Sequence, residues 1–126
     1  MNDSARLKYL SVVLVLSGLI FVFGIYPLMQ FWPAGWRWNP NQPEYEQMIL
    51  GIYATLGIFL LLASRNPLQH LSLIWFTVWS SLVHAGVMAV QSFQYPHERG
   101  HLYGDVPALL IVAIALAALT PRKSAA

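Results

Sequence analysis

A long apolar stretch in the second half of the chain constrains this sequence more than any other feature. Residues 71–94 read LSLIWFTVWSSLVHAGVMAVQSFQ and contain no acid, lysine or arginine. A helix over this stretch is long enough to cross the apolar core of a bilayer, which takes about 20 residues. We therefore predict a membrane-spanning helix over residues 71–94.

One ionisable residue, His84, interrupts this stretch. It lies about ten residues from the end of the stretch, roughly 15 Å along a helix, and therefore near mid-membrane. The side chains predicted to share its helical face are small, polar or sulfur-containing: Thr77, Ser80, Ser81, Met88 and Gln91. Because polar groups facing lipid are costly, we expect this stripe to face neighbouring helices.

Composition extends the membrane prediction to the whole chain. Of the 126 residues 57% are hydrophobic and 10% are charged, against roughly 25% charged in soluble proteins. The apolar residues form four blocks, which predict a single membrane domain, 1–126, with spans over residues 7–29, 46–63, 71–94 and 105–120. The absence of cysteine excludes disulfides, thiol catalysis and thiolate metal sites.

Basic residues flank the apolar blocks and predict the orientation. Two of them, Arg37 and Arg99, fall on one side. Five fall on the other: Arg6, Lys8, Arg65, Arg122 and Lys123. Because the more basic side faces the cytoplasm, we predict an all-α, up-down four-helix bundle in the inner (cytoplasmic) membrane, with both termini cytoplasmic. The bases form no single patch, so nucleic acid is not an expected partner.

Loops and glycines give further packing predictions. The short turn at 64–69 predicts that the second and third spans are antiparallel neighbours. The loop at 30–45 is rich in tryptophan and proline, which predicts an aromatic anchor at the membrane surface, with a lid over a binding site as the alternative. Four glycines are predicted to mark close helix contacts: Gly18, Gly51, Gly57 and Gly86.

Three roles for His84 compete. It could be a structural residue, bonded to a serine or to a tyrosine of a neighbouring helix. It could bind haem or a metal, or it could be the polar contact for a quinone or another lipid-soluble ligand. Haem is disfavoured because the other three spans contain no histidine and His70 lies about 21 Å away on the same helix. A proton-relay carrier is disfavoured because His84 is the only ionisable residue expected within the core.

A second group of candidate residues precedes the fourth span. The spacing of Glu98, His101 and Asp105 could place three metal ligands on one face at the outer side of the membrane. Alternatively, His101 and Asp105 form a hydrogen-bonded pair that fixes the loop over the mouth of the bundle. Asp105 is also placed to act as the N-cap of the fourth span.

Two segments carry a resemblance. NPLQHLSLIWFTVWSSLVHAGVMAVQS and ERGHLYGDVPALL resemble a family of small bacterial membrane proteins defined as a domain of unknown function. That resemblance covers the second half of the chain well and the first half loosely, and it implies a four-helix integral membrane protein. The general plan is also similar to the DoxX-like group, some of whose members are linked to quinol oxidation, but by architecture alone.

These observations leave three functional hypotheses. Because no complete catalytic set is visible, the first is a non-enzymatic subunit or scaffold that pairs with itself or with another membrane protein. The second is a site for a quinone or lipid between the helices, with these candidate contacts: His84, Ser80, Ser81, Met88 and Gln91. The third is the outer-face metal site. A cavity that reaches His84 would favour the second, whereas solid packing around its ring would remove it. The residues identify no cofactor.

Overall fold

The computed structural model describes residues 2–37 and 43–121, and within these ranges every secondary-structure element is helical. The elements are α1 (Asp3–Leu19), the π-helical turn η1 (Ile20–Gly24), α2 (Ile25–Phe31), α3 (Pro33–Trp36), α4 (Pro43–Ala63), the 3-10 turn η2 (Pro67–His70), α5 (Leu71–Gln94), the 3-10 segment η3 (Pro96–Tyr103) and α6 (Asp105–Leu119).

Four helical runs of the described chain are long and apolar enough to cross a membrane. They are Asp3–Phe31, Glu44–Ala63, Pro67–Gln94 and Pro96–Leu119. Their outward faces are apolar: Phe23, Ile52 and Ile111 are 68%, 67% and 66% exposed. Large apolar side chains spread over the sides of a bundle suit a lipid environment, because each would lose about 2 kcal/mol by facing water. The predicted all-helical bundle is confirmed, together with four helical runs that are long and apolar enough to span a membrane.

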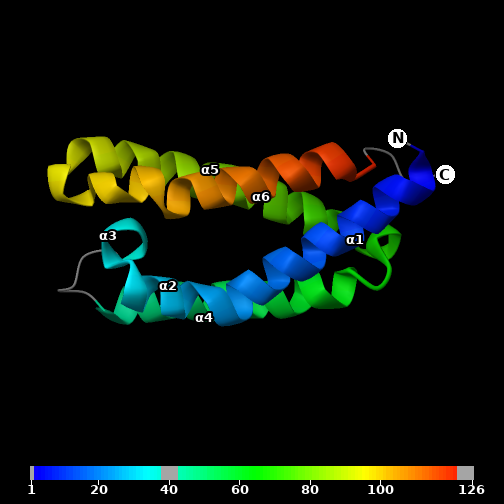
Figure 1. The fold of residues 1–126 in the computed structure, drawn as a ribbon, viewed down its shortest axis with the longest axis horizontal. Coiled ribbons are helices and arrows are strands. Elements are labelled where there is room, and N and C mark those ends of the chain that lie inside the picture. Colours follow the sequence, from blue (N-terminus) through cyan, green and yellow to red (C-terminus); the bar gives the residue numbers. More distant parts are fainter. Residues whose placement is uncertain (1, 38–42, 122–126) are drawn as a thin grey trace.

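The bundle consists of two helix pairs (Figure 1). α5 packs along α6, and α1 packs against α4 and also against α6. The start of α1 and the end of α6 lie together at one end of the molecule, called here the termini end, and α3 lies with η3 at the opposite α3 end (Figure 1). α4 and α5 run antiparallel as predicted, but they contact each other only sparsely, because η2 carries the chain from one pair to the other.

A bend in the first span separates the two pairs. Pro27 lacks an N–H, and its ring crowds the carbonyl of the residue four positions earlier, so a regular helix needs local adjustment there. The π-helical turn η1 directly precedes α2 and provides it. The helix therefore continues to Phe31, with η1 packed against α4 and α2 against α3, while α1 slants towards the other pair (Figure 1).

The two ends of the bundle are packed differently. Towards the termini end, the helices enclose a solid apolar core whose side chains have no exposed surface: Leu10, Leu14, Leu60, Ile74 and Leu116. Beyond the bend, the two pairs move apart, and a cavity remains between them. The bend therefore positions the candidate site in the half of the bundle nearer to α3.

Two of the four predicted glycine contacts are confirmed. A Cβ on Gly18 would lie 2.7 Å from the carbonyl oxygen of Gly57, and a Cβ on Gly57 would lie 2.7 Å from that of Gly18, so α1 and α4 cross backbone to backbone. Gly51 and Gly86 are exposed, and a Cβ on either would meet nothing within 4 Å. The predictions for Gly51 and Gly86 are therefore wrong.

Candidate functional site

A cavity of about 420 Å³ lies between the two helix pairs, on the α3 side of the bend. Its walls come from η1, α2, α3, α4, α5 and α6, and they are mainly apolar. Representative apolar wall residues are Phe21, Ile25, Met29, Leu50, Leu109 and Val112. The residues with polar atoms are Trp36, Tyr45, Glu46, Tyr53, His84 and Asp105.

A tyrosine–histidine pair lies in the wall of this cavity. The hydroxyl of Tyr53 on α4 is hydrogen-bonded to Nδ1 of His84 on α5, and the two ring centroids are 5.3 Å apart. Phe21 packs edge-on against the Tyr53 ring at a centroid distance of 5.1 Å, which fixes the position of the phenol. The prediction that His84 faces neighbouring helices is confirmed, and of the two bonds considered for a structural role, to a serine or to a tyrosine, the structure shows the one to a tyrosine.

The Tyr53–His84 pair keeps one hydrogen-bond donor for a ligand in the cavity, whichever tautomer the His84 ring adopts. If Tyr53 donates its hydroxyl hydrogen to Nδ1, the neutral His84 ring carries its own hydrogen on Nε2. If Nδ1–H donates to the phenol oxygen, the Tyr53 hydroxyl hydrogen remains available. In both cases the pair also keeps an acceptor atom, so it can serve a ligand that accepts or donates a hydrogen bond.

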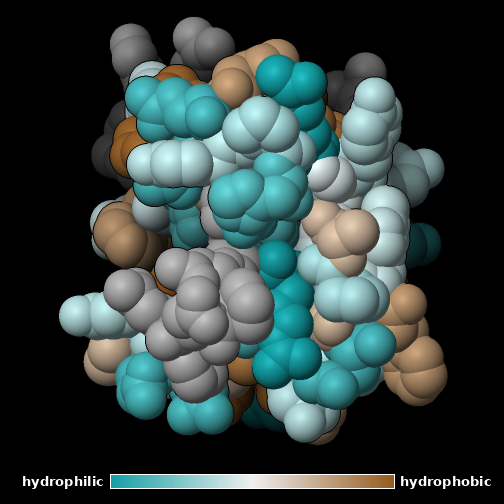
Figure 2. Space-filling view, turned by 90° about the vertical axis from the view of Figure 1, so that its left-hand side faces the viewer, coloured by the Kyte–Doolittle hydropathy of each residue, from teal (hydrophilic) through white to brown (hydrophobic). Residues whose placement is uncertain are grey.

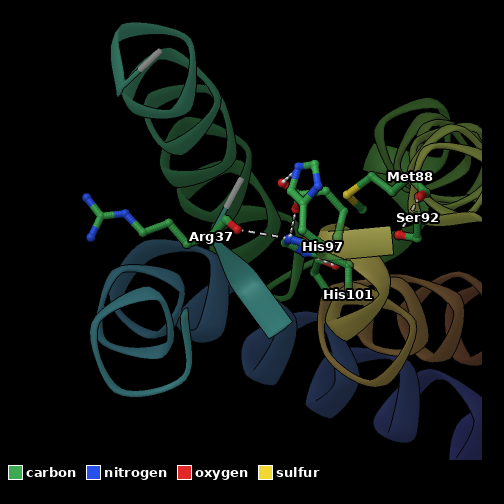
Figure 3. A network of polar contacts seen from close by, with 7 residues as sticks. Arg37, Met88, Ser92, His97 and His101 are labelled. Carbon is green, nitrogen blue, oxygen red and sulfur yellow. Dashed lines mark hydrogen bonds and ion pairs between the residues drawn. The ribbon is translucent and has the colours of Figure 1, made fainter. Parts of the chain in front are cut away.

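A buried polar cluster on η3 and α6 closes the α3 end of the cavity. His101 has no exposed surface, and its Nδ1 lies 2.9 and 3.0 Å from the two carboxylate oxygens of Asp105. Its Nε2 lies 2.9 Å from the backbone carbonyl of Arg37 and 3.0 Å from Oε2 of Glu98. Figure 3 shows the bond from His101 to the Arg37 backbone, with the Arg37 side chain pointing away.

The surroundings of His101 define its charge. Both ring nitrogens face oxygen atoms that only accept hydrogen bonds, namely the carboxylate of Asp105 and the carbonyl of Arg37. A neutral imidazole has a single N–H, so only the imidazolium form can donate from both nitrogens. The cation is then balanced by the carboxylates of Asp105 and Glu98, whose side chains are each about 10% exposed.

Short backbone contacts hold α3 onto this cluster. A Cβ on Gly100 would collide with the carbonyl oxygen of Ala34, and a Cβ on Gly104 would collide with that of Gly35. These two glycines therefore allow η3 to lie directly on the α3 backbone. An ion pair of 3.3 Å between Arg37 Nε and Glu46 links the end of α3 to α4.

A tryptophan of the tryptophan-rich loop lies at the cavity. Trp36 lines the cavity, and its indole Nε1 is buried without a hydrogen-bond partner among the described residues. Trp32 is 44% exposed, whereas Trp38 lies outside the described residues. Figure 2 views this end of the molecule and shows hydrophilic residues gathered over its centre, with hydrophobic residues towards the edges.

The structure places the predicted ligand contacts of α5 unequally. Met88 lines the cavity together with His84, whereas Gln91 is exposed. Ser81 is buried, but it is not among the lining residues. Ser80 Oγ donates a hydrogen bond to the Thr77 carbonyl on its own helix, at 3.3 Å. The polar stripe therefore serves mostly helix packing, and its His84–Met88 portion faces the cavity.

The predicted metal ligands do come together, but they bond to one another. Both His101 nitrogens are engaged, and within residues 2–37 and 43–121 no group of three His, Cys, Asp or Glu side chains could hold a metal ion. The alternative prediction, a His101–Asp105 pair that fixes the loop over the bundle mouth, is confirmed. Gly104 is the N-cap of α6, because the Asp105 carboxylate turns to His101 and makes no capping bond.

Sequence reasoning missed Tyr53, Trp36 and the backbone carbonyl of Arg37. A signal for Tyr53 did exist, since Tyr53 lies ten residues after the start of α4 and His84 lies ten residues before the end of α5. Both residues therefore lie at the same depth below the α3 end. The contact from Arg37 to His101 spans 64 positions of the chain and has no local signal.

The fold and the cavity define a small all-helical protein with four candidate membrane spans around an apolar ligand-sized space. The chain belongs to the family described as "Family of unknown function (DUF6632)", whose model matches residues 4–125. No curated protein and no solved structure matches the chain.

Proposed function

We propose that this protein is a multi-pass membrane protein that binds a hydrophobic ligand of the quinone type between its two helix pairs. The observation that carries the proposal is the cavity of about 420 Å³ that reaches the Tyr53–His84 pair. This is the feature that separates ligand binding from a purely structural role for His84.

The size and lining of the cavity suit a small ring with part of an apolar tail. Ligand sites in proteins usually occupy about 300–1,000 Å³, with mainly apolar walls and a few convergent polar groups. Here the tail would lie against side chains such as Ile25, Leu109 and Val112. The ring would lie near Tyr53 and His84, where a carbonyl oxygen could accept the hydrogen that the pair has free.

The cavity also reaches the lateral surface of the bundle. Three of its lining residues are exposed on the sides of the helices: Ile111 is 66%, Tyr45 61% and Ile49 46% exposed. A molecule dissolved in the bilayer could therefore enter from the side without passing through water. This route favours a lipid-soluble ligand over a water-soluble one.

The orientation of the protein belongs to the same proposal. Arg6 and Lys8 lie in the first turns of α1 and Arg65 follows α4, all at the termini end, whereas Arg37 follows α3 and Arg99 lies in η3, at the α3 end. By the positive-inside rule the termini end faces the cytoplasm of an inner membrane, and the α3 lid faces the opposite side. The role as a subunit of a larger membrane complex, with a second copy or another membrane protein as partner, stays a prediction.

Binding can be tested with decylubiquinone, a quinone with a ten-carbon tail, added to the purified protein in detergent. Bound quinone should quench tryptophan fluorescence through Trp36, which lines the cavity, so quenching should saturate. Ala108→Phe should abolish the saturable quenching, because Ala108 lines the cavity. Ala118→Phe on the exposed face of the same helix is the matched control and should bind like the wild type.

Non-saturable quenching in the wild type would contradict the proposal. Equal binding by the Ala108→Phe and Ala118→Phe variants would also contradict it, because the quinone would then bind elsewhere.

A further inference from the structure

Four ionisable side chains form a continuous chain from the surface of the α3 end to the cavity. The first, His97, has a side chain that is 74% exposed, and its Nε2 lies 3.4 Å from Oε1 of Glu98. Oε2, the other oxygen of Glu98, lies 3.0 Å from Nε2 of His101. Nδ1, the other nitrogen of that ring, lies 2.9 Å from Asp105. Glu98 and His101 thus each use one atom towards the surface and another towards the interior.

The inner end of this chain reaches the same cavity as the Tyr53–His84 pair. Asp105 lines the cavity together with Tyr53 and His84, and it interacts electrostatically with both. The expectation that His84 is isolated from other ionisable groups is therefore wrong. A bound ligand or a water molecule in the cavity could bridge Asp105 and the pair.

The chain of groups leads to one end of the molecule only. Among the described residues, the buried ionisable side chains Glu98, His101 and Asp105 all lie at the α3 end. Towards the termini end the buried polar residues of the described chain are the hydroxyl-bearing Ser17, Thr77, Ser81 and Thr120, which are not ionisable at neutral pH, and the rest of the core is aliphatic.

We propose that His97, Glu98, His101 and Asp105 form a proton path that connects the surface of the α3 end with the ligand cavity. In the outward direction, the O–H bond of a bound phenol or hydroquinone breaks, and its proton moves to Asp105, either directly or through the Tyr53–His84 pair. His101 releases its Nε2 proton to Glu98, and the neutral ring keeps its hydrogen on Nδ1. The ring then turns over, so that the bare Nε2 accepts the proton held by Asp105. Glu98 passes its proton to His97 and then to water, and the ligand keeps the negative charge.

Several neighbouring groups set the electrostatics of this path. The Arg37 carbonyl accepts from the same nitrogen that faces Glu98 and so favours the doubly protonated form of His101, which can release a proton to Glu98. The Arg37 side chain is paired with Glu46, which lines the cavity, so this cation lies beside the path and not within it. The path thus carries one imidazolium between two carboxylates.

This inference rests on the proposed function in one respect, since the proton must come from a ligand in the cavity. It extends that function by restricting the ligand class: in one of its states the ligand must carry an ionisable hydroxyl, as a quinone does once it is reduced.

The path itself can be tested without any ligand. In the purified protein with ¹⁵N-labelled histidine, NMR measures how fast the ring N–H of His84 exchanges with water. Glu98→Gln keeps the size and hydrogen-bonding capacity of the side chain but cannot carry a proton, and it should slow this exchange by about tenfold. Arg99→Gln, an exposed neighbour outside the path, is the control and should exchange at the wild-type rate.

A second variant, at an exposed position of the path, keeps the test valid if Glu98→Gln does not fold. His97→Gln alters an exposed side chain and should slow the exchange less than Glu98→Gln but measurably. Wild-type exchange rates in both variants would overturn the proton path. Decylubiquinone binding by the same variants separates the two proposals. If the variants slow the His84 exchange but the wild type does not bind decylubiquinone, the proposed quinone ligand is overturned and the proton path stands. If decylubiquinone binds normally but the variants exchange the His84 ring N–H at the wild-type rate, only the proton path is overturned.

Discussion

The two halves of this bundle use the same four helical runs in opposite ways. Towards the termini end, Leu14, Leu60 and Ile74 have no exposed surface, and the helices are packed solid. Towards the α3 end, the helices diverge around a cavity, and a buried polar cluster centred on His101 closes the gap. One half is held by side-chain packing, and the other by hydrogen bonds and ion pairs.

The difference between the halves indicates where function resides. A core with close packing resists change, whereas a cavity forgoes packing and must be compensated by contacts elsewhere. Here the compensating contacts lie at the α3 end, where Gly100 and Gly104 allow η3 to pack directly on the backbone of α3. The predictions below test this division, beginning with the largest expected effect.

Substitutions in the buried polar cluster around His101 should reduce stability more than substitutions elsewhere in the molecule. His101→Ala leaves two mostly buried carboxylates, Asp105 and Glu98, without their shared cation, and should lower the free energy of unfolding by about 3 kcal/mol. The measurement is thermal unfolding in detergent, with His97→Ala at the exposed position as the control. Equal melting temperatures for the two variants would mean that the cluster does not hold the α3 end.

The crossing of α1 and α4 should rank second. Gly18→Leu forces a side chain into the Gly57 backbone and should cost about 2–3 kcal/mol. Gly86→Leu adds the same side chain at an exposed position with nothing within 4 Å and should leave the melting temperature unchanged. If Gly86→Leu destabilised the protein as much as Gly18→Leu, the arrangement of the helix pairs would be wrong.

Truncation should distinguish the solid half from the hollow half. Leu14→Ala removes packing contacts on every side and should cost about 2 kcal/mol, while Met88→Ala enlarges an existing cavity and should cost about 1 kcal/mol. Thermal unfolding of both variants in one detergent compares them directly. A larger loss for Met88→Ala would indicate that the cavity half is packed as tightly as the other.

The smallest effect on stability should come from the Tyr53–His84 hydrogen bond. Tyr53→Phe removes one half-buried bond and should cost about 1 kcal/mol, yet it should weaken decylubiquinone binding about tenfold. Tyr26→Phe, at a tyrosine that is 62% exposed, is the control for both measurements. Full quinone affinity in Tyr53→Phe would remove the pair from the site.

The helices and the inward direction of His84 could be predicted from the sequence because they follow from local patterns. Apolar blocks of sufficient length predict spans, and a polar side chain within a span predicts an interior position. The pairing of His101 with Asp105 follows similarly from a short separation along the chain.

The cavity could not be predicted, because it depends on how the helix pairs diverge. The bend at η1 and Pro27 places η1 against α4 and α2 against α3, and no pattern in the apolar blocks encodes that direction. Two of the four glycine predictions failed for a related reason: a small residue permits close approach without requiring it, so Gly18 and Gly86 look alike in sequence. Which helices are neighbours is likewise a property of the whole fold.

The most direct test of the central claim is ¹⁵N NMR of the histidine side chains during a titration with decylubiquinone. His84 lies in the cavity wall, whereas His70 lies in η2 at the far end of the same helical run, so the protein supplies its own control. The account predicts that saturating quinone shifts the ring nitrogen signals of His84 and leaves those of His70 unchanged. Unshifted His84 signals, or equal shifts at both histidines, would contradict it.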